Sequence, residues 1–303
     1  MVGGKGGIEV AQKNFIRKYR MKAGVMGRTG FEIGATTTKN PHALHISFSV
    51  EKSTSETPNT AKVQVWNLSD KSLKVLDTKD CTVQLHAGYT DHIALILVGN
   101  VVTVTTSMDG ADRMTEIEVV DGRVALRDTY LSVSFKGKVN SKDVFNHIAG
   151  AMGVAVVYSK NAKFKTLPNG FSFVGPAKNA LKKLCKTCRL AWSIQNEVLQ
   201  IRKPNEPITA RAYLLNSETG LLDVPKRITI SSESDDSSGG GSSTTSQIGY
   251  EVRYLMNGAI GVNDYVRLES SKARGFFRVY KVTIDGDNME GEWTCTAQLL
   301  EVK

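Results

Sequence analysis

The chain has 303 residues, of which 41% are hydrophobic, and its formal net charge is +9. This composition excludes a disordered chain, and the lack of any run of eighteen apolar residues argues against insertion into a membrane. Four cysteines are too few for a disulfide scaffold, so we expect folding in a reducing compartment. The length exceeds what one hydrophobic core usually organises, so we expect two or three domains.

Basic residues are concentrated in two segments. Residues 1–28 carry seven lysines and arginines against one glutamate, and residues 160–189 carry eight against no acidic residue. Such positive poles favour contact with acidic protein surfaces, phosphate backbones or lipid headgroups. A solvated surface is the alternative interpretation of each segment.

Short strands dominate the N-terminal part of the chain. Ala61, Val63 and Val65 alternate with polar residues, which predicts a strand with one buried face. Ser69 then suits the N-cap position of a short helix, which we expect to follow it. Two Asp-Gly pairs further along, which end at Gly110 and Gly122, are typical of hairpin turns. We therefore expect residues 1–130 to form an antiparallel sandwich or barrel, preceded by a basic arm.

The pattern changes over residues 131–204, where helices alternate with strands. An apolar stripe predicts a first helix, with Ser141 as its cap and Gly153 as its stop. Pro176 opens a second helix at a position that tolerates proline, and AWSIQNEVLQIRK predicts a closing hairpin. The order helix–strand–strand–helix–strand–strand predicts a small α+β domain inserted into a mainly β chain.

Strand patterns return over residues 205–303, where we expect a second antiparallel barrel. The last strand places four core candidates on one face: Trp293, Cys295, Ala297 and Leu299. Residues 231–247 form a Ser/Gly-rich run without an apolar side chain, so we expect a flexible loop within this domain. An interdomain linker is the alternative, but strand-like sequence on both sides of the run favours the loop.

No stretch carries a catalytic, cofactor-binding or metal-binding signature. Cys185 and Cys188 form a CxxC pair near the C-terminal end of a predicted helix, where the dipole disfavours a thiolate. We expect two buried thiols, with a redox pair and a metal site as the alternatives. The N-terminal GGKGG lacks the Ser or Thr of a phosphate loop. Asp235 and Asp236 lie in the expected loop, which cannot hold acid–base geometry. We predict a protein that is not an enzyme and uses no cofactor or metal.

The second helix of the middle domain offers the clearest contact surface. Lys178, Lys182 and Lys186 recur at helical spacing opposite the apolar face, and Arg189 follows them. These four residues are the candidate partner-contact site, for an acidic protein surface or nucleic acid. A solvated helix face is the alternative. No aromatic residue interleaves the stripe, which gives little support to base stacking.

Much of the sequence resembles one protein family. The N-terminal barrel of baseplate hub proteins from contractile-tailed bacteriophages is similar to the run ISFSVEKSTSETPNTAKVQVWNLSDKSLKVL followed by VQLHAGY. In that family a PN loop, a strand ending in NLS and a short helix precede an AGY strand. The second barrel of the family is similar to LLDVPKRITI, YEVRYLMNGAIGVNDYVRLES and GFFRVYKVTIDGDNMEGEWTCTAQL. The middle module resembles the small inserted domain of such hubs.

The resemblance implies two barrels of the tail-tube type in each chain and assembly as a homotrimer. Three chains would then present six similar barrels to the sixfold tail tube and a threefold seat to the central spike. It also implies contacts with other baseplate proteins, and DNA only as passing cargo. The protein would reside in the tail baseplate of the virion, after assembly in the host cytoplasm.

Two other functions stay open on the sequence. A nucleic-acid-binding protein would use the basic N-terminal arm and the helix over residues 176–189, and its affinity would fall steeply with salt. A tail-associated cell-wall hydrolase would need a paired acid or metal set, for which the sequence offers no plausible candidate.

Overall fold

Antiparallel strands make up the first part of the chain. The computed structural model of the protein describes residues 16–25, 27–34, 43–90, 92–209, 211–234 and 243–302. The first elements are β1 (Arg17–Gly24), β2 (Phe31–Gly34), β3 (Ile46–Ser53), β4 (Thr60–Trp66), α1 (Asp70–Leu76), β5 (Thr82–Tyr89), β6 (His92–Asp109) and β7 (Asp112–Val120). The strands pair in the order β3-β4-β7-β6-β5-β1-β2. We call this part the N-terminal half.

Local sequence signals explain most of these elements. The alternating residues Ala61, Val63 and Val65 of β4 are buried, as predicted. The predicted cap of α1 is confirmed, because the Ser69 hydroxyl accepts a hydrogen bond from the N–H of Ser72 at 3.2 Å. The first Asp-Gly pair turns β6 into β7. The second does not form a hairpin, because Gly122 adopts a left-handed φ of 65° and caps a helix instead.

The last third of the chain, which we call the C-terminal half, is also built of strands. They are β15 (Ala212–Leu215), β16 (Lys226–Ser234), β17 (Ser243–Leu255), β18 (Tyr265–Glu269), β19 (Arg274–Asp287) and β20 (Trp293–Glu301). Strands β16, β17, β20 and β19 pair antiparallel in that order, and β18 pairs with β19. Strand β15 runs parallel to β18, whereas the sequence led us to expect only antiparallel pairing in this part of the chain.

The Ser/Gly-rich run differs from its expected form at both ends. Strands β16 and β17 pair as far as Ser234 and Ser243, so strand structure enters the run from either side. Backbone groups make these ladder hydrogen bonds, so a strand does not require apolar side chains. Residues 235–242 lie outside the described part of the chain.

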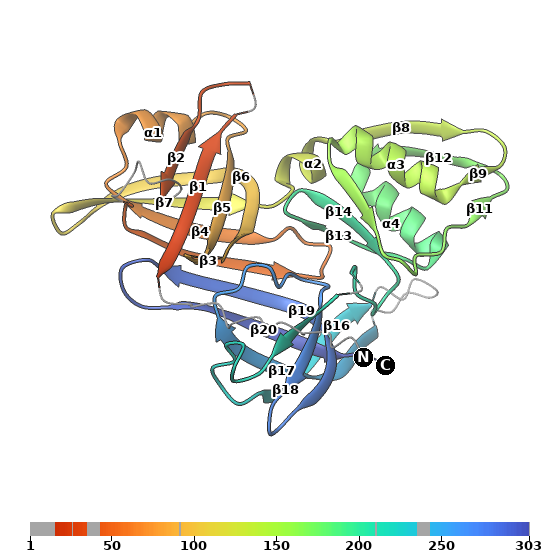
Figure 1. Cartoon of the computed structure of the whole chain (residues 1–303). Coiled ribbons are helices and arrows are strands. Elements are labelled where there is room, and N and C mark those ends of the chain that lie inside the picture. Colours follow the sequence, from red (N-terminus) through yellow and green to blue (C-terminus); the bar gives the residue numbers. More distant parts are fainter. Residues whose placement is uncertain are drawn as a thin grey trace, which may run out of the picture.

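One pairing joins the two halves into a single sheet. Strand β3 pairs antiparallel with β19, from Lys281 opposite Ser53 to Asp287 opposite Ser47 (Figure 1). Thirteen of the described strands thus form one sheet, whose main path runs from β16 to β2 without a pairing that closes it. Both halves contribute to one hydrophobic cluster. The four predicted core residues of β20 all lie in that cluster: Trp293, Cys295, Ala297 and Leu299.

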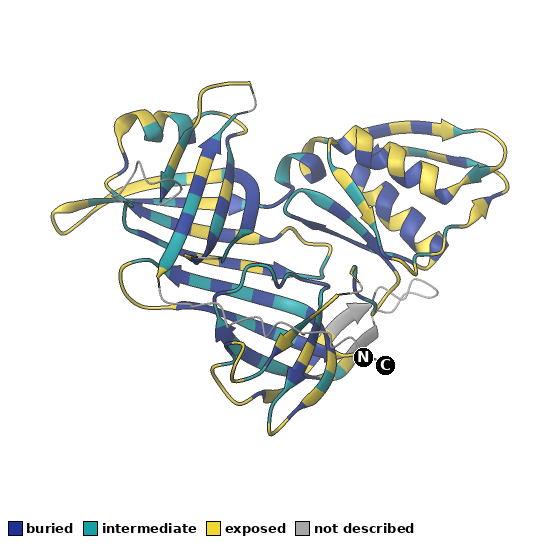
Figure 2. Ribbon diagram, viewed as in Figure 1, coloured by how far each residue is buried: buried dark blue, intermediate teal, exposed yellow. Residues whose placement is uncertain are grey.

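The segment between the halves, which we call the middle module, mixes helices and strands. Its elements are α2 (Arg123–Asp128), β8 (Tyr130–Phe135), β9 (Val139–Asn140), α3 (Ser141–Met152), β10 (Ala155–Tyr158), β11 (Thr166–Leu167), β12 (Phe171–Pro176), α4 (Ala177–Cys188), β13 (Ala191–Gln195) and β14 (Val198–Arg202). Strand β14 pairs with β13 in the predicted hairpin and runs parallel to β10. Helices α3 and α4 turn their buried faces toward a separate hydrophobic cluster (Figure 2).

The cap of α3 differs by one residue from the sequence prediction. Asn140 is the N-cap, and its Oδ1 accepts a hydrogen bond from the N–H of Lys142 at 2.9 Å. Ser141 is the first helical residue, and its buried hydroxyl accepts from the N–H of Lys165 at 2.9 Å instead. The predicted stop is confirmed, because Gly153 adopts a left-handed φ of 69°. Pro176 lies one position earlier than predicted, as the N-cap of α4.

The helices of the described chain are all too short or too polar to cross a bilayer.

Candidate functional site

The exposed face of α4 carries the contact residues predicted from the sequence. Lys178, Lys182, Lys186 and Arg189 are all exposed, because the apolar residues of the helix turn into the core of the middle module. Arg189 ends the helix with a left-handed φ of 57°. Positive side chains suit this end of the helix, where the dipole is negative. The structure therefore places the four residues on one face, and their role in binding stays a prediction.

Two further lysines extend this basic face. Lys183 Nζ lies 5.5 Å from the ring centre of Phe171 and 5.9 Å from that of Phe173. Lys165 Nζ donates a hydrogen bond to the carbonyl oxygen of Thr187 at 2.8 Å. The two rings come from β12, so helical spacing within α4 could not reveal them. The fold thus brings two aromatic rings of β12 next to the basic face of α4, which has no aromatic residue of its own.

The basic N-terminal segment is a strand of the sheet in its described part. Lys5 and Lys13 lie outside the described residues, whereas Arg17 to Lys22 belong to β1. Arg17 donates hydrogen bonds to the carbonyl oxygens of Asp287 at 2.6 Å and Gly291 at 2.9 Å. Arg17 therefore ties β1 to the C-terminal half, which makes it a structural residue.

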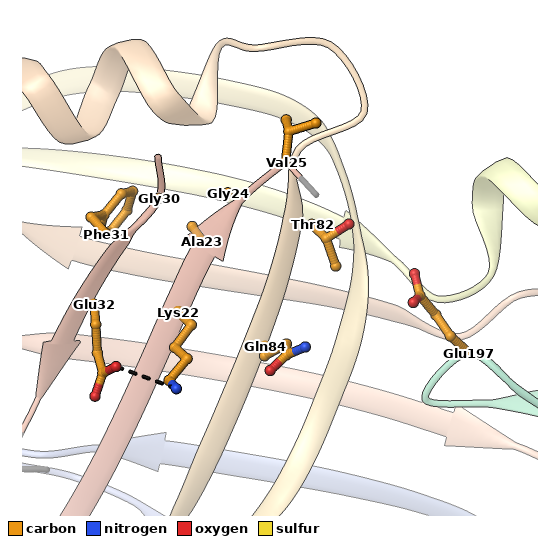
Figure 3. Close-up of a pocket in the computed structure, with 10 residues that line it drawn as sticks. All are labelled: Lys22, Ala23, Gly24, Val25, Gly30, Phe31, Glu32, Thr82, Gln84 and Glu197. Atoms are coloured by element: carbon orange, nitrogen blue, oxygen red, sulfur yellow. Dashed lines mark ion pairs between the residues drawn. The ribbon is translucent and has the colours of Figure 1, made fainter. Parts of the chain in front are cut away.

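A pocket of about 540 Å³ lies beside the β1–β2 hairpin (Figure 3). The ion pair of Lys22 with Glu32, at 3.4 Å, stands on one side, and Glu197 from the β13–β14 turn stands on the other. Burial, followed by the nearby charge of Asp121, raises the pKa of Glu197. A carboxyl with a raised pKa can act as an acid. A catalytic site needs more than this one property, because a nucleophile and a base must also lie within hydrogen-bond reach of each other.

The CxxC pair is buried at the C-terminal end of α4. Cys185 and Cys188 are both free and buried, which confirms the predicted thiol pair. Burial, followed by the neighbouring Cys188, raises the pKa of Cys185 well above its usual value, so this thiol stays protonated. Across the described residues, no three His, Cys, Asp or Glu side chains are grouped closely enough to hold a metal ion.

A buried polar network attaches the β13–β14 hairpin to the N-terminal half. Asp121, at the end of β7, accepts hydrogen bonds from the backbone N–H groups of Asn196 at 2.6 Å and Glu197 at 2.8 Å. It also accepts one from Asn59 Nδ2 at 3.1 Å. Lys52 Nζ donates to Asn196 Oδ1 at 2.6 Å. Because these partners are far apart in sequence, sequence reasoning identified Asp121 only as a turn residue.

A second polar contact attaches the same hairpin to the C-terminal half. Asn263 Nδ2 donates hydrogen bonds to Gln200 Oε1 at 3.0 Å and to Ser193 Oγ at 3.4 Å. Arg278 Nη1 donates to Asn263 Oδ1 at 3.1 Å. We call these two contacts together the polar joint. It fixes the position of the middle module against both halves of the sheet.

Solved structures of phage tail proteins share this fold. The 43 kDa tail protein of prophage MuSo2 from Shewanella oneidensis matches with a TM-score of 0.60 and 8% identity, over 94% of this chain and 98% of that one. The tail protein from Neisseria meningitidis MC58 matches with a TM-score of 0.58 and 9% identity, over 93% and 96% of the two chains.

A third similar structure comes from a secretion machine. It is an Escherichia coli component of the type VI secretion system, which exhibits structural similarity to the bacteriophage T4 tail proteins gp27 and gp5. It matches with a TM-score of 0.57 and 9% identity, over 88% of this chain and 76% of that one. No protein-family model and no curated protein matches the sequence. The chain therefore has the fold of phage tail proteins, and the family resemblance seen in the sequence is confirmed at the level of the fold.

Proposed function

We propose that the protein is a structural, non-enzymatic hub in the baseplate of a contractile phage tail, where it joins the tail tube to the central spike. The observation that carries this proposal is the fold shared with tail proteins over nearly the whole chain. The continuous sheet through β3 and β19 supports it, because such a sheet places two strand-rich halves side by side in one subunit. A scaffold of this kind works by geometry, without chemistry.

The proposal assigns a role to each part of the chain. Residues 1–130 and 205–303 form two tube-like barrels, and residues 131–204 form an inserted α+β domain. The separate hydrophobic cluster of the middle module supports an inserted domain, although this cluster also includes Ala125 and Leu126 of α2, just before residue 131. Strands β2 and β16 end the path of the described sheet, and strands at such ends can pair with neighbouring chains. Three chains would then supply six barrels around a channel through which DNA passes.

Solution mass tests the hub directly. Light scattering at several protein concentrations, alone and with a trimeric spike, should give a species of three times 33.0 kDa, or a complex built on it. A chain that stays monomeric at every concentration, with and without the spike, would contradict the trimeric adaptor. In the virion, antibody labelling should then locate the protein in the tail baseplate.

The basic face of α4 has a role of its own in the proposal, which is contact with an acidic surface of another baseplate protein. Nucleic-acid binding is the competing function, because the exposed lysines of α4 would also suit phosphates. The triple variant Lys178→Glu, Lys182→Glu, Lys186→Glu distinguishes the two functions. The DNA affinity of the unmodified protein and of this variant is measured at several salt concentrations. Tight binding by the unmodified protein that falls steeply with salt, and is lost in the variant, would favour nucleic acid.

A matched control removes three exposed lysines elsewhere. Lys71, Lys74 and Lys79 lie in or just after α1, and their substitution by glutamate makes the same change in net charge. If both triple variants weaken binding equally, the effect is one of total charge and the α4 face has no special role. If DNA binds only weakly to all three proteins, the structural proposal stands.

A further inference from the structure

A lysine occupies a core-facing position of β3. Ile46, Phe48 and Val50 alternate inward along this strand, and Lys52 continues their face with only 5% of its surface exposed. Lysine is almost never buried without a partner. Among the described residues, the Nζ atom of Lys52 donates one hydrogen bond, to Asn196 Oδ1 at 2.6 Å. The buried amine is therefore held against a single side-chain amide.

The fold holds the side-chain amide of Asn196 in place. The backbone N–H of Asn196, in the β13–β14 turn, donates a hydrogen bond to Asp121 Oδ2 at 2.6 Å. Its Oδ1 also accepts a hydrogen bond from the N–H of Val98 at 3.2 Å. Because a C=O bond is about 1.2 Å long, Lys52 Nζ lies no more than about 3.8 Å from the amide carbon Cγ. Reacting atoms poised for attack lie about 3–3.5 Å apart, so a small rotation of the lysine brings its amine within reach.

The surroundings of Lys52 favour a neutral amine. Burial, partly offset by the nearby charge of Asp121, lowers the pKa of Lys52 from 10.5 to about 8. About a tenth of the amine is then neutral at pH 7, and only the neutral form is a nucleophile. Other titratable groups nearby include Glu197, next to Asn196 in the turn, and Asp264, which lines a cavity shared with Lys52 and Asn196. Burial raises the pKa of both carboxyls.

We propose that Lys52 and Asn196 form an intramolecular isopeptide bond. The neutral amine attacks Cγ, so that the Nζ–Cγ bond forms and the Cγ–Nδ2 bond breaks. One amine proton passes to the leaving Nδ2, which departs as ammonia, and the step needs no oxidant or reductant. The N–H of Val98 stabilises the negative charge that develops on Oδ1 during the attack. The shared cavity, of about 380 Å³, provides room for the leaving ammonia.

The bond would join the middle module covalently to the N-terminal half. It would link two residues that are 144 positions apart, at a joint that otherwise depends on hydrogen bonds. A cross-link that closes a long loop stabilises the fold by restricting the unfolded chain. Where the bond has not formed, Lys52 stays a titratable amine and the joint depends on its hydrogen bonds. The inference is independent of the tail role, so either can fail without the other.

Intact-mass spectrometry of the denatured protein tests the bond. We expect a mass below that of the sequence by about 17 Da, which is the mass of ammonia. Lys52→Met should show the full mass of its own sequence, whereas Lys71→Met, at an exposed position, should keep the loss. A succinimide at Asn257 and Gly258 would release ammonia too, but that loss would persist in Lys52→Met.

Tryptic digestion of the unmodified protein locates the bond and does not depend on a variant that folds. Because trypsin does not cleave after an acylated lysine, residues 40–62 should be recovered joined to residues 190–202. Any unbonded protein should lose ammonia about ten times faster at pH 9 than at pH 7, because the neutral fraction of the amine rises. Two results would overturn the proposal. One is a full sequence mass that remains after incubation at pH 9, and the other is a loss of ammonia that persists in Lys52→Met.

Discussion

At the scale of single residues, Trp293 links the two halves of the sheet. Its Nε1 donates a hydrogen bond to the carbonyl oxygen of Gly88 at 3.0 Å, and its ring meets Phe48 edge-on at 5.5 Å between centres. Trp293→Phe keeps most of the apolar contact but leaves that buried carbonyl without its donor, which should cost about 1–3 kcal/mol. Trp293→Ala also opens a cavity and should cost about 3–5 kcal/mol.

Urea unfolding measures both losses. The control is Phe276→Ala, because Phe276 is 52% exposed and its truncation should cost less than about 1 kcal/mol. A Phe variant as stable as the unmodified protein would show that the bond to Gly88 adds nothing to the contact between the halves.

Lys52 makes stability depend on pH. Burial lowers the pKa of Lys52 from 10.5 to about 8, and the nearby charge of Asp121 offsets only part of this shift. Between these two pH values the unfolded chain binds more protons at this site than the folded chain, so the free energy of unfolding rises with pH. Below pH 8 both states are protonated and the full cost of burial is present.

The substitution Lys52→Met removes this dependence. The unmodified protein should gain up to about 3 kcal/mol relative to the variant as pH rises from about 8 to 10.5. Urea unfolding of both proteins across that window gives the difference, and Lys71→Met controls for the loss of a positive charge at an exposed position. A difference that stays constant across the window would mean that Lys52 remains hydrated in the folded protein.

At the scale of elements, the N-terminus of α3 has two adjacent polar residues with different roles. Asn140 caps the helix, and Ser141 binds the N–H of Lys165 instead. Asn140→Ala removes the acceptor of the Lys142 N–H and should cost about 1 kcal/mol. Asn140→Asp keeps an acceptor and adds a negative charge at the positive end of the helix dipole, so it should be neutral or stabilising. Equal destabilisation by both substitutions in urea unfolding would show that Asn140 acts by another contact.

Local sequence signals predicted most helices and strands. The features they did not predict depend on contacts between residues far apart in the sequence. The alternation in β20 and the apolar face of α4 depend on neighbouring residues, so the sequence was enough to find them. The pairing of β3 with β19 joins residues more than 200 positions apart, and no local pattern encodes it. Of the candidate surface, helical spacing predicted Lys178, Lys182 and Lys186. Lys183 with the rings of β12 required the tertiary fold.

At the scale of the whole molecule, two hydrophobic clusters meet through polar contacts. The first cluster spans both halves of the sheet, and the second belongs to the middle module. Between them the polar joint depends on buried groups such as Asp121, which is fully buried and accepts three hydrogen bonds. Buried polar contacts of this kind require a defined geometry, and the loss of one partner lowers the free energy of unfolding because the other partner stays buried without a hydrogen bond. The middle module should therefore separate from the sheet before either cluster unfolds.

The substitution Asp121→Ala tests this order. It leaves the N–H groups of Asn196 and Glu197 without acceptors and Lys52 without a nearby negative charge, at a cost of about 3 kcal/mol or more. Hydrogen exchange should then show early loss of protection in the β13–β14 turn, while β20 stays protected. Asp109→Ala is the control, since Asp109 is exposed and accepts only from Trp66 Nε1 among its described contacts. A uniform loss of protection across β13, β14 and β20 would mean that the two clusters unfold as one unit, so that the joint couples them instead of marking a boundary.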